Sequence, residues 1–121
     1  MNRHAAEKRG RGAETLACWY LRLHGWRILA RRARVPGGEV DIVARRRGIV
    51  AFVEVKSRPT LAEAAEAVTP AGRQRIARAA SLWLARNPAA AELTLRFDAV
   101  LLAPHRWPRH MAGVFDADGA A

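Results

Sequence analysis

Residues Gly37 to Arg58 read GGEVDIVARRRGIVAFVEVKSR and contain two apolar runs of β type, each carrying acidic residues. In the second run, from Ile49 to Lys56, successive side chains alternate between two faces, so Glu54 and Lys56 point the same way. An ionised carboxylate inside an apolar sheet is unfavourable unless it has a metal ion or a basic partner. This stretch therefore predicts both a pair of central strands and a charged site on them.

The first run carries its acidic residue in the middle of the strand. Alternation places Val40, Ile42 and Ala44 on one face and Asp41 on the other. The arginine-rich connection to the second run ends in a glycine, which predicts an antiparallel hairpin. Asp41 and Glu54 then converge on one end of the hairpin, where a divalent cation can bind between two carboxylates with water in its other positions.

A structural salt bridge is the alternative interpretation of these charges, with Asp41 or Glu54 paired to Lys56 or to an arginine. One feature of the composition favours chemistry instead. Of the 21 Lys and Arg residues, only Lys8 and Lys56 are lysines. A lysine at the end of a buried strand therefore indicates a need for a compact ammonium group that holds a water molecule or a phosphate oxygen.

Asp41, Glu54 and Lys56 form the pattern D-x12-E-x-K, which suits phosphodiester hydrolysis. A metal held by the two carboxylates would act as a Lewis acid and lower the pKa of a bound water, while Lys56 would orient that water or stabilise developing charge. The pattern alone is weakly specific, and its strand-hairpin-strand setting strengthens it.

Composition bounds the class of protein. The 121 residues suffice for one domain, and the formal charge of +10 favours a polyanionic partner, nucleic acid first. The single cysteine, Cys18, excludes an internal disulfide and a cysteine-based zinc cluster. The chain has no long apolar run and no signal-peptide segment, so a cytoplasmic protein without a membrane partner is expected.

Periodicity and capping signals predict the remaining elements. In chain order they are a basic arm or an entry to the first helix at 1–12, a helix at 13–24, an edge strand at 26–35, the hairpin, a short helix or loop at 61–68, a helix at 70–86 capped by Thr69, a strand at 93–102, and a closing segment with a short strand and a disordered tail at 116–121. A strand before and after the second long helix implies a crossover. We therefore expect one α/β domain over residues 1–121, with a mixed sheet, helices on its faces and the order α-β-β-β-α-β.

Charged residues outside the hairpin leave some choices open. Glu14 shares a helix face with Cys18 and Leu21, either as a frayed-end charge near the positive helix terminus or as a third acidic arm of the site. In the strand at 93–102, Arg96 and Asp98 share a face and are predicted to pair.

The histidines and most of the tryptophans are interpreted as ordinary surface and core residues. The histidines show no metal-ligand spacing and are predicted to be surface or tail residues: His4, His24, His105 and His110. The tryptophans are expected to fill a small core: Trp19, Trp26, Trp83 and Trp107. Only Trp107, flanked by proline and basic residues, is also a candidate for base stacking.

The segment GEVDIVARRRGIVAFVEVKSR resembles the signature of the small bacterial YraN-like family, which is similar to the restriction-endonuclease-like PD-(D/E)XK nucleases and, within them, to Holliday-junction resolvases. The resemblance covers nearly the whole chain. Its other parts are the Gly12-x-Glu14 helix, the VTP helix start at 68–70, the RFDAV strand at 96–100, and the closing pair His110 and Phe115.

This resemblance implies a restriction-endonuclease-like, three-layer α/β/α fold. It implies that Asp41 and Glu54 ligate Mg²⁺ or Mn²⁺ with help from the Val55 carbonyl, that Lys56 is catalytic, and that Glu14 completes the acidic set. The best candidates for substrate contacts are Arg58, Arg73, Gln74 and Arg78. This chain departs from the family in having Arg31-Arg32 where asparagine is common and Gly72-Arg73 where lysine is common.

Together these features predict a metal-dependent endonuclease that hydrolyses phosphodiester bonds in DNA, with branched or junction DNA as candidate substrates. The alternative is a non-catalytic nucleic-acid-binding protein of the same fold. A third interpretation is a partner-binding protein whose charge is incidental. Symmetric junctions are usually handled by two-fold dimers, so a homodimer is also predicted.

Overall fold

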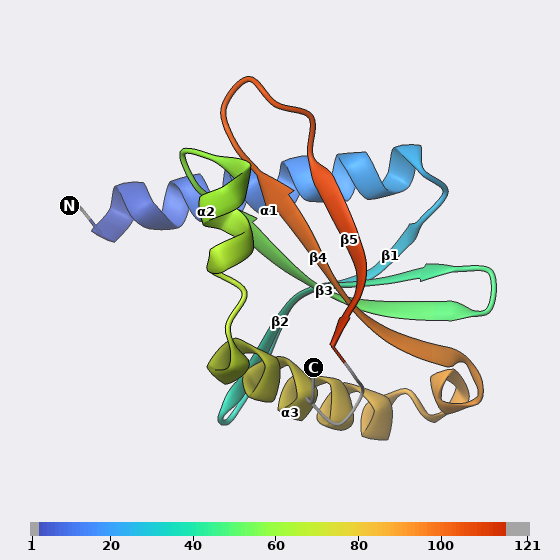
Figure 1. Cartoon of the computed structure of the whole chain (residues 1–121). Helices are drawn as coiled ribbons and strands as arrows, with labels where there is room; N and C mark the ends of the chain where they lie inside the picture. The colour runs from blue at the N-terminus through green and yellow to red at the C-terminus, as the bar shows by residue number, and fades with distance from the viewer. Residues whose placement is uncertain (1–2, 116–121) are drawn as a thin grey trace.

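A five-stranded mixed sheet, in the order β1-β2-β3-β4-β5, forms the centre of the computed structural model, which describes residues 3–115 (Figure 1). The elements in chain order are α1 (Arg3–Leu23), β1 (Arg27–Val35), β2 (Gly38–Arg46), β3 (Ile49–Ser57), α2 (Leu61–Glu66), α3 (Pro70–Arg86), the 3-10 helix η1 (Pro88–Glu92), β4 (Thr94–Leu102) and β5 (Arg109–Phe115). Neighbouring strands are antiparallel except β3 and β4, which are parallel because the chain crosses over through α2 and α3. The predicted order is confirmed, and α2, η1 and β5 add to it.

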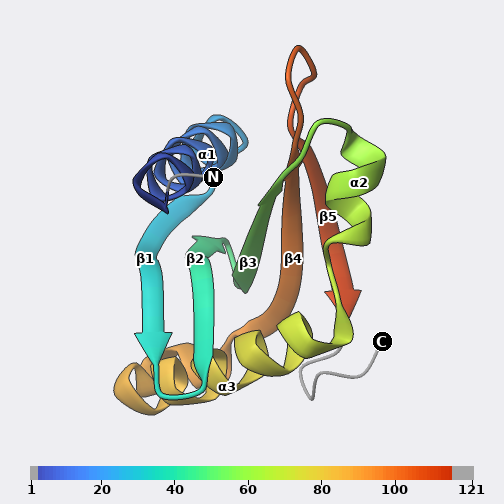
Figure 2. The ribbon, with the colours of Figure 1, turned by 90° about the vertical axis from the view of Figure 1, so that its left-hand side faces the viewer.

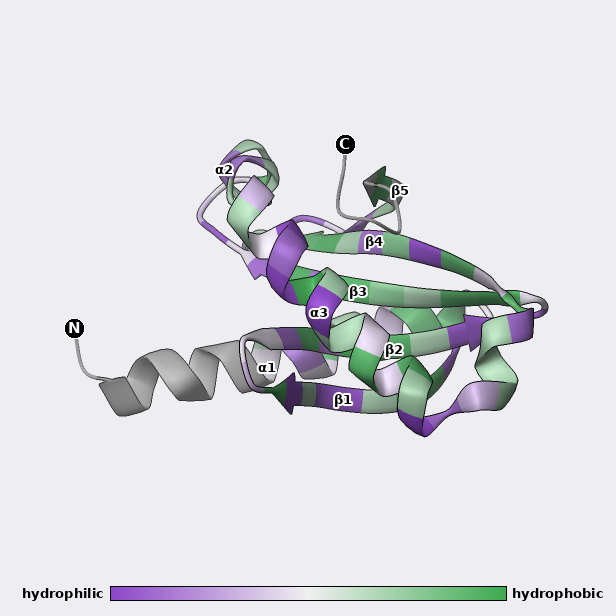
Figure 3. Cartoon of the chain, turned by 90° about the horizontal axis from the view of Figure 1, so that it is seen from below, coloured by the Kyte–Doolittle hydropathy of each residue, from purple (hydrophilic) through white to green (hydrophobic). Residues whose placement is uncertain are grey.

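Helices cover both faces of the sheet, which confirms the expected α/β layering (Figure 2). On one face Leu21 of α1 packs with Ile42 and Val53. On the other face Ile76 of α3 packs with Phe52 and the neighbouring apolar residues of β2 and β4. The interior strands β3 and β4 are hydrophobic along much of their length (Figure 3), as strands covered on both sides should be.

The first helix is longer than expected. Residues 3–12 continue α1, so of the two interpretations of this basic segment the structure has the entry to the first helix. Each helical glycine disfavours a helix by about 1 kcal/mol relative to alanine, and Gly10 and Gly12 lie among alanine, glutamate, lysine and arginine, which favour helix. Residues 1–2 and the tail expected at 116–121 lie outside the described residues.

The faces of β2 differ from strict alternation. Ile42 and Ala44 pack against the α1 side, as expected, but Val40 packs with the α3 side. The ladder between β2 and β3 ends at the pair Ile42–Val53. Beyond that pair β2 no longer follows the plane set by β3, so the predicted common face of Val40, Ile42 and Ala44 is wrong at Val40.

A buried ionic network fastens β4 to β5. The Asp98 side chain is fully buried and accepts hydrogen bonds from Arg96 Nε and Nη2, at 2.8 and 2.9 Å, and from the Gly113 amide at 3.0 Å. His110 Nε2 lies 2.7 Å from Asp98 Oδ2. The predicted Arg96–Asp98 pair is confirmed. The prediction that His110 is a surface residue is wrong, because its strand pairs antiparallel with β4 and turns the ring inward.

Two of the four tryptophans are not core residues. Trp26 is buried and Trp83 packs against Phe52, whereas Trp19 and Trp107 are 58% and 83% exposed. Trp19 lies with Leu16 and Leu23 on the side of α1 opposite its buried face. The spacing of apolar residues could not show that Trp19 is exposed, because α1 carries apolar residues on two opposite sides.

The strand β1 forms one edge of the sheet and is rich in arginine. These residues are Arg27, Arg31, Arg32 and Arg34. The edge strand expected at 26–35 is confirmed.

No helix within residues 3–115 is both long and apolar enough to cross a membrane.

Candidate functional site

The site lies where β2 and β3 stop pairing. Asp41 comes immediately before Ile42, whose pair with Val53 is the last of the β2–β3 ladder. The Val55 amide donates a 2.7 Å hydrogen bond to Asp41 Oδ2. A side chain of β2 therefore takes the place of a backbone acceptor and holds its carboxylate against β3.

Glu54 is buried in this region, with 7% of its surface exposed. Its Oε1 lies 3.0 Å from Lys56 Nζ, because the two residues point to the same side of β3 as expected. Its Oε2 is buried and has no hydrogen-bond partner. The predicted salt bridge is therefore present at Glu54, but it uses only one of the two carboxylate oxygens. An unsatisfied buried acceptor such as the other oxygen typically destabilises a fold by about 1–3 kcal/mol.

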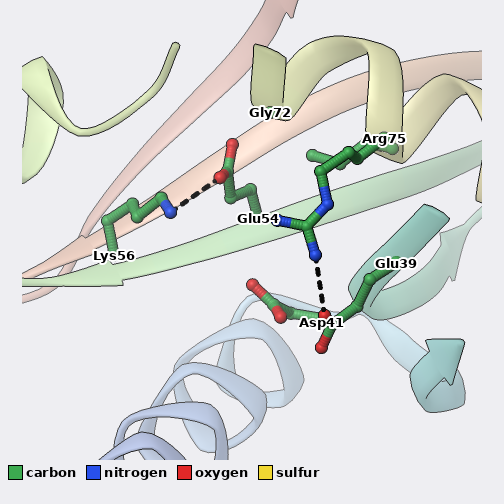
Figure 4. A pocket seen from close by; sticks show the side chains of 7 residues that line it. Glu39, Asp41, Glu54, Lys56, Gly72 and Arg75 are labelled. Carbon is green, nitrogen blue, oxygen red and sulfur yellow. Dashed lines mark hydrogen bonds and ion pairs between the residues drawn. The ribbon is translucent and has the colours of Figure 1, made fainter. Parts of the chain in front are cut away.

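A cavity of about 90 Å³ joins these groups beneath the start of α3 (Figure 4). Its lining residues are Glu39, Asp41, Glu54, Lys56, Gly72, Arg75 and Ile76. The helix begins with Thr69, whose Oγ1 accepts the Gly72 amide at 3.2 Å, and with proline at its first position, as predicted. The capped end of α3 therefore forms one wall of the cavity.

Gly72 permits the helix to approach this closely. A Cβ at position 72 would lie 3.3 Å from Glu54 Oε1 and 3.4 Å from Thr69 Oγ1. The first contact is tighter than an ordinary van der Waals contact. The glycine thus leaves room beside the carboxylate at the point where the cavity opens to the helix.

The electrostatics of the cavity centre on Asp41. Burial raises the pKa of Asp41 from its ordinary 3.8 to about 6, against the lowering effect of the Val55 amide. The nearby charges of Glu14, Glu39 and Glu54 raise it further. Asp41 forms no ion pair with any residue of the part of the chain described by the structure. The site therefore concentrates negative charge that its own cations do not fully balance.

Glu14 approaches this cluster from α1. It is buried, and its Oε1 accepts a 2.8 Å hydrogen bond from Arg32 Nε. Because α1 begins at Arg3, Glu14 lies in the helix interior and the frayed-end interpretation is wrong. Arg32 has φ +53°, in the left-handed region that asparagine adopts more readily than arginine.

The residues at the cavity fit a divalent cation. Asp41 and Glu54 supply carboxylate oxygens, one of which is buried without a partner. The Val55 carbonyl points to the same side of β3 as its amide, which faces Asp41. Among the side chains that the structure describes, residues 12–114, no three of His, Cys, Asp or Glu are grouped closely enough to hold an ion by themselves. A cation here would rely on two carboxylates, a backbone oxygen and water, as Mg²⁺ sites commonly do.

The four expected substrate-contact residues are dispersed. Arg58 is exposed and donates to the Ser57 carbonyl, and Gln74 is exposed on α3. Arg73 lines a different cavity, between α2, α3 and β5. Arg78 donates a 2.6 Å hydrogen bond to the Pro36 carbonyl, which fastens α3 to the β1–β2 turn. None of the four lines the cavity that holds Asp41 and Glu54.

Sequence reasoning did not place Gly72, Arg75 or Glu39 at the acidic site. Arg75 Nη2 lies 3.3 Å from Glu39 Oε2, and the Arg75 guanidinium reaches from α3 toward the space between Glu54 and Glu39 (Figure 4). Arg34 Nε lies 3.5 Å from the other Glu39 oxygen. A signal was present, because positions 72, 75 and 76 follow the i, i+3, i+4 spacing of a single helix face.

Relatives of the chain are found in several bacteria. A family model described as "Uncharacterised protein family UPF0102" matches residues 13–102. The chain is 57% identical over 115 residues to a UPF0102 protein of Rhodopseudomonas palustris (strain BisA53), covering 95% of this chain and 88% of that protein. It is 56% identical over 115 residues to one of Bradyrhizobium diazoefficiens, covering 95% and 86%. It is 53% identical over 116 residues to one of Methylobacterium nodulans, covering 96% and 90%.

Proposed function

The chain belongs to the uncharacterised protein family UPF0102, the YraN-like family expected from its sequence, and we propose that it is a metal-dependent endonuclease that hydrolyses phosphodiester bonds in DNA. The proposal includes branched or junction DNA as a substrate and a restriction-endonuclease-like kinship for the fold. A two-fold dimer and a cytoplasmic location remain predictions from the sequence.

One observation carries the proposal: the buried carboxylate of Glu54 and the half-buried carboxylate of Asp41 line one cavity whose acidic side chains outnumber its basic ones. Glu54 Oε2 is an orphaned acceptor, and the pKa of Asp41 is raised to about 6 by burial and by its acidic neighbours. A purely structural pair would be expected to satisfy both partners. A divalent cation would give Glu54 Oε2 a partner and would offset the negative charge around Asp41.

The residues of the chain then have distinct tasks. Asp41 and Glu54, with the Val55 carbonyl, would hold Mg²⁺ or Mn²⁺, which supplies Lewis-acid chemistry at the scissile phosphate. Lys56 lies beside Glu54 and is placed to orient the attacking water and to stabilise negative charge. Arg75, at the mouth of the cavity, is placed to bind a phosphate oxygen through its planar guanidinium.

The charge of the chain supports a polyanionic substrate. Its formal net charge is +10, and affinity for nucleic acid should therefore fall steeply with added salt. Glu14 contributes to the acidic cluster but is held by Arg32. We assign it the task of setting the charge around Asp41 rather than of binding the ion directly.

The second candidate is a nucleic-acid-binding protein of the same fold that does not cut. The ion pair between Glu54 and Lys56 favours it, because it occupies both groups that the D-x12-E-x-K pattern assigns to catalysis. The two candidates share salt-dependent binding and differ at the metal.

The test uses labelled single-stranded, duplex, flap and four-way-junction DNA with Mg²⁺ or Mn²⁺. We expect cleavage of at least one substrate, with loss of products in Asp41→Asn and Lys56→Ala. We also expect Mn²⁺ to raise the melting temperature of the wild-type protein and to raise that of Asp41→Asn less, because only a bound ion stabilises the native state.

Absence of cutting on every substrate, or equal cutting by both variants, would refute the endonuclease. Salt-dependent DNA binding by the wild type, without cleavage and without a metal-dependent melting shift, would favour the binding protein. Glu92→Gln serves as the matched control, because Glu92 is an exposed carboxylate in η1 and does not line the cavity.

A further inference from the structure

The loop between β4 and β5 presents a tryptophan to solvent. It spans residues 103–108, and Trp107 within it is 83% exposed. Trp107 has no ring or cation–π contact with any residue in the described part of the chain. A large aromatic side chain that leaves most of its surface in solvent suggests an external partner.

The loop has a defined conformation despite its exposure. Two prolines, Pro104 and Pro108, fix φ near both ends, and His105 adopts a φ of +61°. The Arg106 amide donates to the Ala103 carbonyl at 3.3 Å and closes a turn. The ring is therefore presented by a preorganised turn, which reduces the entropy lost on binding.

The surroundings of Trp107 are positively charged. Arg106 and Arg109 are exposed on either side of it, and the chain from 103 to 115 contains no acidic residue. A partner that offers flat rings together with negative charge fits this surface best. Single-stranded nucleic acid has both, since its unstacked bases bind aromatic side chains while its phosphates attract arginine.

The position of the loop links it to the cavity. Leu102, the last residue before the loop, is paired with Ser57, and its carbonyl accepts the Arg58 amide at 3.1 Å. The loop thus rises beside the end of β3 at which Glu54 and Lys56 lie. Figures 1 and 2 both show it projecting beyond the end of the sheet.

We propose that Trp107, with Arg106 and Arg109, forms a stacking site for an unpaired nucleobase of a strand bound next to the cavity. The inference deepens the proposed function by naming the part of the substrate that this surface takes. The inference depends on the proposed function in one respect, that the bound strand is the substrate of the enzyme. Binding at Trp107 itself requires neither a metal ion nor cleavage.

The test measures binding in metal-free buffer. The probes are a fluorescein-labelled oligothymidylate of about 12 nucleotides, within the site size of single-strand-binding surfaces, and a blunt duplex of equal length. We expect Trp107→Ala to weaken single-strand binding about tenfold, as loss of one stacked base does, and duplex binding less than about threefold. Trp107→Phe should retain most of the affinity, because phenylalanine also stacks.

Trp19→Ala is the matched control. Trp19 is also exposed, but it lies between Leu16 and Leu23 on α1. This variant should bind both probes like the wild type. Intrinsic fluorescence should be quenched by oligothymidylate in the wild type and in Trp19→Ala, and much less in Trp107→Ala.

Equal binding by wild type and Trp107→Ala, or an equal loss on both probes, would overturn the inference. A fluorescence response of Trp107 to anionic lipid vesicles and none to oligothymidylate would overturn it in favour of a membrane surface. A protein that cuts no DNA but loses single-strand affinity in Trp107→Ala would refute the endonuclease and leave the stacking site standing. Cleavage with unchanged binding in Trp107→Ala would do the reverse.

Discussion

The Val55 amide donates its hydrogen to the Asp41 carboxylate over 2.7 Å, at the point where the backbone pairing of their two strands has ended. The bond holds a half-buried acidic side chain of β2 against β3. Asp41 and Glu54 both line the cavity, and Glu54 Oε2 is buried there without a hydrogen-bond partner. The unfavourable electrostatics of this site should therefore appear in the free energy of unfolding.

Asp41→Asn should stabilise the metal-free protein at pH 7.5. An asparagine oxygen still accepts the Val55 hydrogen bond, and the buried charge is removed. The wild-type pKa is raised by about two units, which corresponds to an upper limit of about 3 kcal/mol in unfolding free energy. We expect a gain of about 1–3 kcal/mol in urea unfolding.

The gain should depend on pH. The native protein holds the Asp41 proton more tightly than the unfolded chain, so the wild type loses stability as pH rises from about 4 to about 6. Asparagine does not titrate. The difference between variant and wild type should thus be small at pH 4 and reach its plateau above pH 6.5, and a variant less stable than wild type at pH 7.5 would contradict the assignment.

Gly72→Ala should impair cleavage without unfolding the protein. Alanine normally favours a helix by about 1 kcal/mol, but here its Cβ presses on Glu54 Oε1. We expect kcat/KM to fall at least about tenfold through the displaced carboxylate. Gly12→Ala in α1 is the control, because a Cβ there meets nothing within 4 Å. It should raise the unfolding free energy and leave cleavage unchanged.

Arg75→Ala should lower kcat/KM by about 100-fold, the typical effect of removing one charge-stabilising donor. The unfolding free energy should change by less than about 0.5 kcal/mol, because the Arg75 side chain is largely exposed and its ion pair with Glu39 is screened by solvent. Arg86→Ala removes the same charge from the last turn of α3. Equal losses of activity in the two variants would show that Arg75 acts only through net charge.

Asp98→Asn should destabilise the protein by about 3–5 kcal/mol at pH 7, the usual effect of breaking a buried ion pair. Burial alone would raise the pKa of Asp98, but hydrogen bonds from His110, Arg96 and Gly113 outweigh it and lower the pKa below 3.8. The stabilisation is therefore present above pH 4 and is lost as pH falls through the lowered pKa. Urea unfolding at pH 7 and pH 3 should show the difference shrinking, and a constant difference would exclude this origin.

Local patterns predicted the centre of the molecule well. Alternation along β3 is a property of three consecutive residues, so the shared side of Glu54 and Lys56 follows from the sequence. The start of α3 follows from Thr69 and Pro70 for the same reason. The mixed sheet required only the order of the elements.

Long-range docking explains what was missed. Arg75 meets Glu39 only because α3 crosses β2, and Arg78 is used by the Pro36 carbonyl for the same reason. His110 turns inward because β5 pairs with β4 across a loop. These contacts join residues far apart in the chain, and no local periodicity encodes them.

The arginine-rich strand β1 has a consequence for how copies of this protein coexist. A strand at the edge of a sheet offers a row of backbone donors and acceptors on which another chain can extend the sheet. Repeated like charges along β1 make two such edges repel one another. Part of the positive charge of this small protein therefore resists aggregation at high concentration, whether or not a polyanion is present.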